Sequence, residues 1–156
     1  MLAISKWIYV VALAVWLGAV TFFSFVVAPS VFGALPASEA GQVVAAIFPS
    51  YYRIGYASGV ALVASAFFLW RRTPGASGRW AMTTGLAAIM LASVLYAGLI
   101  VQPRAHALRV SLLDPAAAPT VRAEFDQLHR RAVQLNGIVL LAGLLMTTLT
   151  AASIKP

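Results

Sequence analysis

The stretch "ISKWIYVVALAVWLGAVTFFSFVV", residues 4–27, decides the class of fold. It has no charged residue after Lys6, and it is longer than the roughly 20 apolar residues that a helix needs to cross a bilayer. The competing interpretation is a secretory signal peptide, because a lysine precedes the apolar core. That core is longer than the about 7–15 residues usual in signal peptides, and its small-residue cleavage pattern is poor. The stretch therefore predicts a membrane span that the mature protein keeps.

The composition of the whole chain points the same way. Of its 156 residues, 62% are hydrophobic and only 10% are charged, whereas a soluble domain has about half apolar and about a quarter charged residues. A chain of this length exposes a large share of its surface, so it cannot hide that much apolar area in a core surrounded by water. We therefore predict an integral membrane protein that uses the lipid bilayer as its solvent.

Three more stretches have the length and apolar character of membrane spans, at about 51–70, 80–101 and 133–154. With 4–27 they predict an all-α integral membrane four-helix bundle, with a single domain over residues 1–156. Aromatic rings prefer the interface between membrane and water, and such residues lie near the predicted span ends. They are Trp7, Tyr51, Tyr52, Trp70 and Trp80.

The connections between the spans differ in character. Residues 28–50 contain three prolines and a helical pattern, which predicts a short interfacial helix after the first span. Residues 71–79 form a tight polar turn. After Pro103 the helical pattern continues, is broken by "DPAAAPT" at 114–120, and then resumes. We expect spans three and four to extend beyond the membrane as a helical hairpin that turns near Pro115–Pro119.

Charge and cysteine content limit the classes of partner. The formal net charge is +7 and there is no cysteine, so disulfides, thiolate metal sites and cysteine nucleophiles are excluded. We expect the arginines to meet lipid head groups at the span ends, and we expect no nucleic-acid partner, since no separate basic domain exists. The short loop 71–79 carries only basic charges, which favours both termini in the cytoplasm of a bacterium, with the chain in the inner membrane.

Small residues predict where the helices pack closely. Gly55 and Gly59 stand four residues apart, a spacing that lets two helix backbones approach each other. We expect further packing positions at Trp16, Gly18 and Gly143.

Polar residues gather before the last span, in "EFDQLHRRAVQLNG" at 124–137. Phe125, His129, Ala132 and Asn136 fall within about 40° of one line on a helix, and we expect this face to point into the bundle. Asp126 stands three residues before His129, close enough for a hydrogen bond that would fix the tautomer of the imidazole.

The third helix offers a matching face with Gln102, His106 and Arg109. If the hairpin turns near residue 117, the two histidines of the chain, His106 and His129, come to nearly equal height. In a functional interpretation they bind a haem iron or a metal ion, with Asp126 as a further ligand or as a partner of His129. In the structural interpretation, which we favour, a polar cluster forms hydrogen bonds between helices. Its members are Phe125, His129, Asn136, Gln102 and Arg109.

Three motifs resemble a known family. The first comprises Trp16, Gly18, Phe22, Phe23, Ala28, Pro29 and Phe32; the second Ala40, Gly41, Phe48, Pro49, Tyr51 and Tyr52; the third Phe125, Leu128, His129, Leu135 and Asn136. Together they resemble the transmembrane-protein-205-like family, whose bacterial members are catalogued as a domain of unknown function. The first motif is also similar, more weakly, to the copper-resistance D membrane domain.

The resemblance implies four membrane helices and no established enzymatic activity. In animal members it also implies a link to platinum-drug tolerance and vesicle traffic. This chain lacks the cysteines and methionine pairs that a carrier of soft metals would favour, which argues against platinum or copper handling.

Three functional hypotheses follow. The first is a non-enzymatic accessory subunit that contacts lipid, a membrane-protein partner or further copies of itself as a homo-oligomer. The second is a haem- or metal-binding subunit for electron transfer that uses His106 and His129. The third is an oligomeric carrier of small molecules or ions. An enzyme is disfavoured, because no serine sits in a nucleophile elbow and no carboxylate pair lies within a span.

Overall fold

The computed structural model describes residues 1–112 and 118–152, and every secondary-structure element within these ranges is a helix. Four helical rods are long and apolar enough to cross a membrane: Leu2–Ala34, Ala37–Arg72, Pro74–Ser111 and Pro119–Ala151. At about 1.5 Å per residue they measure roughly 50–57 Å, against about 30 Å of hydrocarbon in a bilayer. The predicted all-α four-helix bundle is confirmed, and the chain is a membrane protein.

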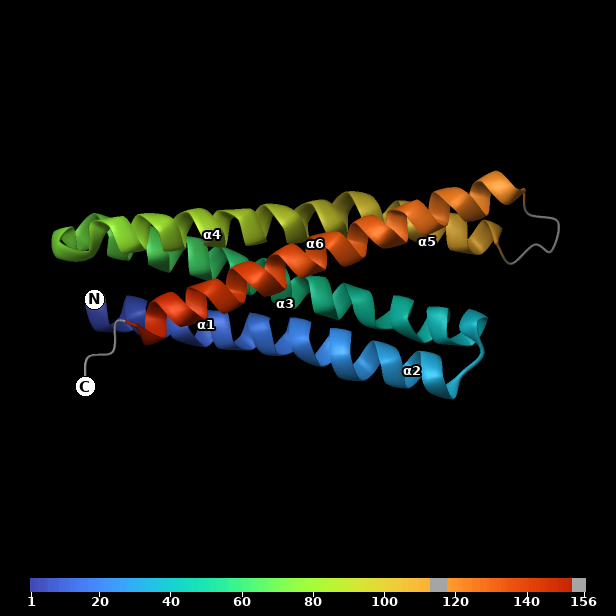
Figure 1. Ribbon diagram of the computed structural model, residues 1–156, viewed down its shortest axis with the longest axis horizontal. Helices are drawn as coiled ribbons and strands as arrows, with labels where there is room; N and C mark the ends of the chain where they lie inside the picture. Colours follow the sequence, from blue (N-terminus) through green and yellow to red (C-terminus); the bar gives the residue numbers. More distant parts are fainter. Residues whose placement is uncertain (113–117, 153–156) are drawn as a thin grey trace.

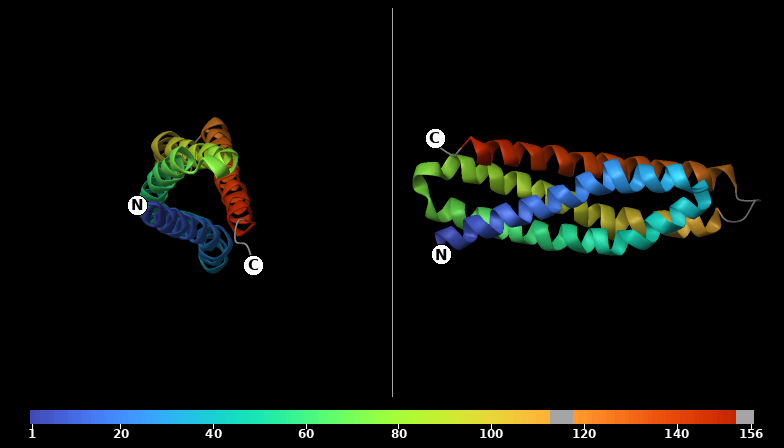
Figure 2. Two further views of the ribbon diagram at one scale, coloured as in Figure 1. Left: turned by 90° about the vertical axis from the view of Figure 1, so that its left-hand side faces the viewer. Right: turned by 90° about the horizontal axis from the view of Figure 1, so that it is seen from below.

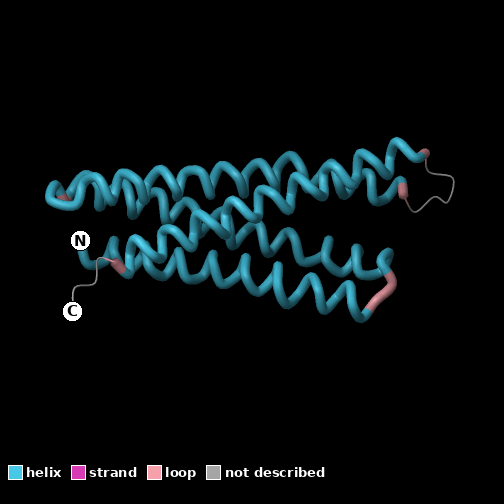
Figure 3. Tube along the Cα trace, viewed as in Figure 1, coloured by secondary structure: helices cyan, strands magenta, loops and turns pink. Residues whose placement is uncertain are grey.

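Two of the rods contain a π-helical segment, and Figure 3 shows that loops are confined to the ends of the bundle. The elements are α1 (Leu2–Phe22), η1 (π, Phe23–Val27), α2 (Ala28–Ala34), α3 (Ala37–Arg72), η2 (3-10, Pro74–Ala76), α4 (Ser77–Tyr96), η3 (π, Ala97–Val101), α5 (Gln102–Ser111) and α6 (Pro119–Ala151).

The rods run antiparallel to their neighbours in sequence (Figure 1), and α3 packs between α1 and α4 while α6 covers α4 and crosses α1. The amino terminus, the η2 turn and the end of α6 lie at one end of the bundle. Figure 2 shows the whole bundle viewed from this end and from below. At the opposite end, here called the far end, lie the turn between α2 and α3 and the tips of α5 and α6.

The prediction of a separate interfacial helix at residues 28–50 is wrong. Residues 28–34 continue the first rod as α2, and α3 runs unbroken through Pro49. A proline removes one backbone hydrogen bond from a helix, but tertiary packing overrides this local signal in membrane helices. Here Phe48 and Tyr51, on either side of Pro49, both pack against Phe23 of η1.

The extended hairpin is present, since α5 and α6 lie side by side past the end of η3. Its turn, with Asp114 and Pro115, lies outside the described residues, as do the last residues of the predicted fourth span and Lys155. The first hairpin is extended as well, because α2 and the beginning of α3 also project at the far end. The sequence patterns predicted the extension of only one hairpin.

The centre of the bundle is formed by large side chains against small ones. Trp16 is 2% exposed and lies on Gly55 and Gly59, where an added Cβ would come within 3.5 Å and 3.1 Å of its indole. A Cβ on Gly143 would lie 3.0 Å from Leu17 of α1. These glycines therefore set the distance between α1 and its neighbours, α3 and α6.

Gly18 differs from these positions. It is exposed, and a Cβ built there meets no heavy atom of the described chain within 4 Å. Gly18 therefore contributes nothing to the packing within this bundle and belongs to its outer surface.

Candidate functional site

Three hydrogen-bonded side chains form what is here called the polar layer: Ser24 of η1, Tyr51 of α3 and Asn136 of α6. The hydroxyl of Tyr51 donates to Oδ1 of Asn136, and Nδ2 of Asn136 donates to Oγ of Ser24 at 2.8 Å. Within a membrane protein such bonds satisfy polar groups that lipid cannot satisfy. The polar layer thus ties three rods together at one height.

An aromatic cluster adjoins the polar layer. The ring of Phe23 lies 4.9 Å from that of Tyr51 and 5.6 Å from that of Phe48, and Tyr52 stacks on Tyr56 at 6.2 Å. Tilted and offset arrangements of this kind are the favourable geometries for aromatic pairs. The cluster holds the first rod against α3 on both sides of Pro49.

Both π-helical segments border this region. η1 supplies Phe23 and Ser24, and η3 supplies Gly98, whose added Cβ would lie 2.8 Å from the ring of Tyr52 and in contact with the hydroxyl of Tyr56. A side chain at Gly98 would therefore displace these rings. π-Helical turns are rare and often occur at functional positions, so the region around the polar layer is the candidate site within the bundle.

Arg109 makes a second connection, nearer the tip of the far end. Its Nη1 donates to the carbonyl oxygen of Gly41 in α3, and its guanidinium lies 5.6 Å from the ring centroid of Phe125 in α6. Burial lowers the pKa of the Arg109 guanidinium. One side chain of α5 therefore joins both projecting hairpins.

The predicted site residues fall into separate places. Asn136 belongs to the polar layer, Phe125 and Arg109 pack together nearer the tip, and Gln102 is half-buried at the beginning of α5. Asp126, His106 and His129 are exposed. The structure therefore does not collect the predicted set into one cluster.

The expectation that His129 faces the interior needs correction. The preceding residue, Leu128, is 6% exposed and takes the buried position, so His129 is turned about 100° away from it. Within residues 1–112 and 118–152, no group of three or more His, Asp or Glu side chains is placed to hold a metal ion. The haem or metal site at His106, His129 and Asp126 stays a prediction, which an absorption spectrum of the purified protein would test.

Sequence reasoning singled out Asn136 but missed its partners Ser24 and Tyr51. A serine within a charge-free apolar run is a usable signal, because its hydroxyl needs a partner inside the membrane. Which helix supplies that partner depends on the arrangement of the bundle, and the sequence alone does not contain it.

The surface at the far end has two different halves. Beyond the polar layer, α5 and α6 carry Arg104, Glu124 and further charged residues, and Arg104 pairs with Glu124 at 2.5 Å. The chain from Trp7 to Ser38, by contrast, contains no charged residue. Two phenylalanine rings of this segment, Phe25 in η1 and Phe32 in α2, are 64% and 49% exposed. η1 lies at the height of Ser24 and α2 lies beyond it, where the other hairpin carries its charges.

The comparisons with known proteins follow this architecture. The model of a domain of unknown function, DUF4149, matches residues 11–112. The chain belongs to the DUF4149 family. An uncharacterized protein of Aquifex aeolicus (strain VF5) is 35% identical over 99 residues, which are 64% of this chain and 67% of that protein. No solved structure matches the chain.

The DUF4149 match extends from α1 to the end of α5. It includes Ser24 and Tyr51 of the polar layer, the uncharged segment η1–α2, and Arg109. The expectation of a bacterial domain of unknown function is thereby confirmed.

Proposed function

We propose that this DUF4149 protein is a non-enzymatic accessory subunit that holds a partner protein along the outer side of its first rod at the far end. The observation that carries the proposal is the exposed, uncharged surface of η1 and α2 beyond the polar layer, with Phe25 and Phe32 at its centre.

The positions of charged residues along α3 support a position outside the hydrocarbon for this surface. The bonds of the polar layer fix Ser24, Tyr51 and Asn136 at one height. Along α3, the uncharged stretch 54–70 covers about 25 Å, close to the hydrocarbon thickness, and Arg53 bounds it near Tyr51. Phe32 follows Ser24 by eight residues, which is roughly 12 Å further from the membrane centre.

An apolar surface at that height is stabilised when another molecule shields it from water. Removing it from water is favourable by roughly 25 cal/mol per Å², and contiguous apolar patches of several hundred Å² mark interaction sites. The Arg109 hydrogen bond to Gly41 holds the α2–α3 hairpin beside α5, which supports a surface that runs along the bundle axis instead of lying flat on the membrane. A protein partner is the cover that fits this geometry.

The chemistry of the polar layer supports binding over catalysis. Its groups are a phenol, an amide and a hydroxyl that bond to one another, and the hydroxyl of Ser24 accepts from Asn136 instead of facing a general base. The resemblance to the transmembrane-protein-205-like family, which has no established enzymatic activity, supports the same function. The proposed location is a bacterial inner membrane with both termini in the cytoplasm.

Photo-crosslinking in native membranes tests the proposal. A benzophenone amino acid replaces Phe32 in one variant and Leu141 in another, the latter being 69% exposed on α6 within the predicted fourth span. We expect a protein adduct of one defined mass from position 32 and lipid adducts from position 141. Lipid adducts alone from both positions would contradict the proposed function.

A further inference from the structure

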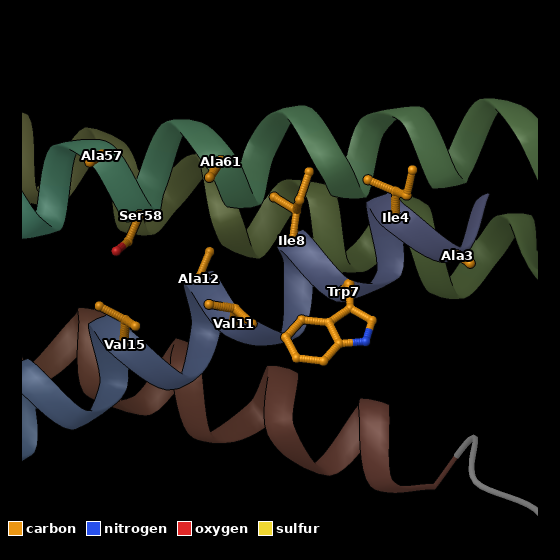
Figure 4. A pocket seen from close by; sticks show the side chains of 10 residues that line it. All are labelled: Ala3, Ile4, Trp7, Ile8, Val11, Ala12, Val15, Ala57, Ser58 and Ala61. Carbon is orange, nitrogen blue, oxygen red and sulfur yellow. The ribbon is translucent and has the colours of Figure 1, made fainter. Parts of the chain in front are cut away.

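A groove lies between α1 and α3 towards the amino-terminal end of the bundle, and it is here called the α1–α3 groove (Figure 4). The lining residues of α1 extend from Ala3 to Val15 and share one face of a regular helix. The α3 side carries only the small side chains of Ala57, Ser58 and Ala61. The groove has a volume of about 600 Å³, and it exists because small residues of α3 face larger ones of α1.

The lining of the groove is apolar and open to the surroundings of the chain. Trp7 and Val15 are 73% and 50% exposed, and none of the described lining residues is charged. The groove lies within the hydrocarbon, because α1 has no charged residue after Lys6 and α3 is uncharged from residue 54 to residue 70. Water is absent at that depth, so a molecule in the groove has to be apolar where it contacts these side chains.

Length and width favour a hydrocarbon chain as the occupant. From Ala3 to Val15 the groove measures roughly 18 Å along α1, against about 15 Å for half of the hydrocarbon core. A helix of the same length, about 10 Å across, would need roughly 1,400 Å³ and does not fit into the groove. A single acyl chain, one carbon atom wide, does. The groove therefore matches the depth of one lipid leaflet.

The α3 side of the groove continues towards the membrane surface as one line of residues. Its members follow one another by three and four positions, which places them on one face of an α-helix. They are Ser58, Ala61, Ser65, Phe68 and Arg72. The guanidinium of Arg72 lies 5.6 Å from the ring centroid of Phe68. Since Arg72 follows the uncharged stretch 54–70 directly after Arg71, the line ends in a cation at the level of the head groups.

The charges at this end of the bundle favour an anionic head group. Arg72 is exposed and forms no ion pair with any described residue. The described acidic residues, Glu39, Glu124 and Asp126, all lie towards the far end, near the beginnings of α3 and α6. The described basic residues at the amino-terminal end are Lys6, Arg71, Arg72 and Arg79. Basic pockets between membrane helices are the sites that bind anionic lipid head groups.

Trp7 offers a second polar contact beside the groove. It lies roughly 6 Å along α1 from Ala3, where the groove begins, and its indole N–H forms no hydrogen bond with the described residues. A tryptophan near the membrane surface keeps its ring in apolar surroundings and turns its N–H to a polar partner. The ester and phosphate oxygens of a lipid whose chain lies in the groove provide that partner.

We propose that the α1–α3 groove binds an acyl chain of an anionic phospholipid from the leaflet on the amino-terminal side, with the lipid phosphate on Arg72. A guanidinium suits this role, because its N–H groups donate two parallel hydrogen bonds to a phosphate. The site lies towards the opposite end of the first rod from Phe32. It therefore goes beyond the proposed function and does not depend on it.

Native mass spectrometry of the purified full chain tests the groove. The probes are phosphatidylglycerol and phosphatidylcholine with the same acyl chains, mixed in equal amounts, and we expect phosphatidylglycerol to be retained several-fold over phosphatidylcholine. Ala61→Phe fills the groove and should lower the bound phosphatidylglycerol several-fold. Ala64→Phe is the matched control, since Ala64 is exposed on α3 and does not line the groove. Equal retention in the two variants would overturn the proposal, because it would report annular lipid only.

Arg72→Gln tests the head group in the same experiment. We expect the preference for phosphatidylglycerol over phosphatidylcholine to fall several-fold, because the variant removes the cation at the end of the groove. Arg79→Gln removes a cation at the same end from α4, which does not line the groove, and should keep the preference. A preference that is missing in the unmodified protein or unchanged in Arg72→Gln would overturn the assignment of an anionic lipid.

A photoreactive lipid tests the site without any substitution, and so decides the question even if Ala61→Phe does not fold. Phosphatidylglycerol with a diazirine in its acyl chain is added to the unmodified protein, irradiated, and its adducts are mapped by peptide mass spectrometry. We expect adducts at residues 3–15 and 57–61 that unlabelled phosphatidylglycerol suppresses and phosphatidylcholine does not. Adducts spread equally over the exposed side of α6, at Leu141 and Leu144, would overturn the site.

The outcomes separate this inference from the proposed function. If a benzophenone at Phe32 attaches to lipid alone while the diazirine labels the groove, the proposed function is overturned and the lipid site stands. If the benzophenone attaches to a protein while the diazirine labels all exposed faces equally, the lipid site is overturned and the proposed function stands.

Discussion

The two hairpins that project at the far end have the same helical architecture but differ in the composition of their surfaces. The α5–α6 hairpin carries arginines, acids and both histidines on its surface, whereas η1 and α2 of the other hairpin expose phenylalanines and carry no charge. A charged helical surface is solvated by water without help. An uncharged apolar surface at the same height is not solvated in this way, and in the proposed function a partner protein covers it. In the proposed function, the α2–α3 hairpin is therefore the one that contacts the partner, and the variants below test how it is held and what it meets.

The largest expected effect comes from breaking the junction at the base of the two hairpins. Gly98→Val would push a side chain into the rings of Tyr52 and Tyr56. Overpacking of this kind destabilises by roughly 1–3 kcal/mol, and we expect the upper end of that range because both rings are held by neighbours. Thermal or denaturant unfolding in detergent, followed by near-ultraviolet circular dichroism, measures it.

Gly85→Val is the matched control for that variant. Gly85 is exposed on α4, and a Cβ there meets no heavy atom of the described chain within 4 Å. An equal loss of stability in both variants would contradict the role assigned to the contact between Gly98 and the tyrosines.

Arg109→Ala is expected to separate the hairpins at their tips. It removes the hydrogen bond to Gly41 and the contact with Phe125. Hydrogen bonds from charged groups contribute about 1.5–3 kcal/mol, so we expect a loss of about 2 kcal/mol and faster hydrogen exchange in residues 37–48. Arg122→Ala, at an exposed position on α6, should leave exchange in that segment unchanged. The same exchange rate in both variants would disprove the link.

Asn136→Leu tests whether the polar layer holds the uncharged rod in place. It removes two hydrogen bonds, to Tyr51 and to Ser24. Such bonds between membrane helices are worth about 1–2 kcal/mol in peptides and less in whole proteins, so we expect a loss of about 1–2 kcal/mol. In a double-mutant cycle with Ser24→Ala the losses should not add, since both variants remove the same bond. Strict additivity would speak against the bond.

The smallest effect is expected on the charged hairpin. Glu124→Gln removes the ion pair with Arg104, but the two side chains are 37% and 68% exposed. Exposed ion pairs contribute about 0–1 kcal/mol, so the stability should change by less than about 0.5 kcal/mol, and the small difference should vanish at high salt. A loss larger than that of Asn136→Leu would reverse the ranking of the two hairpins.

The sequence predicted the features that depend on composition along a single segment. Four apolar runs with aromatic residues at their ends are enough for the four rods, because a span needs only length and hydrophobicity. Local signals failed where packing decides the outcome. Pro49 indicated a break, yet the aromatic cluster on both sides of it keeps α3 continuous.

The candidate site was predicted only in part, for the same reason. Asn136 could be recognised as a polar group on an apolar face, but the face containing Leu128 and not His129 turned out to be buried. Neighbouring positions differ by only about 100° on a helix, so a small error in the predicted face exchanges Leu128 for His129. The partners Ser24 and Tyr51 come from helices 112 and 85 residues away in sequence, and their approach depends on how the rods pack.

Spin labelling of single-cysteine variants tests the central claim most directly, namely that protein covers the uncharged surface beyond the polar layer. Nitroxides are placed at Phe32 on α2, at Ala123 on the charged hairpin and at Leu141 on the outer side of α6, all exposed in the single chain. In native membranes we expect position 123 to be accessible to a water-soluble nickel chelate and position 141 to oxygen dissolved in lipid. Position 32 should be shielded from both reagents. Ready access of either reagent to position 32 would contradict the account.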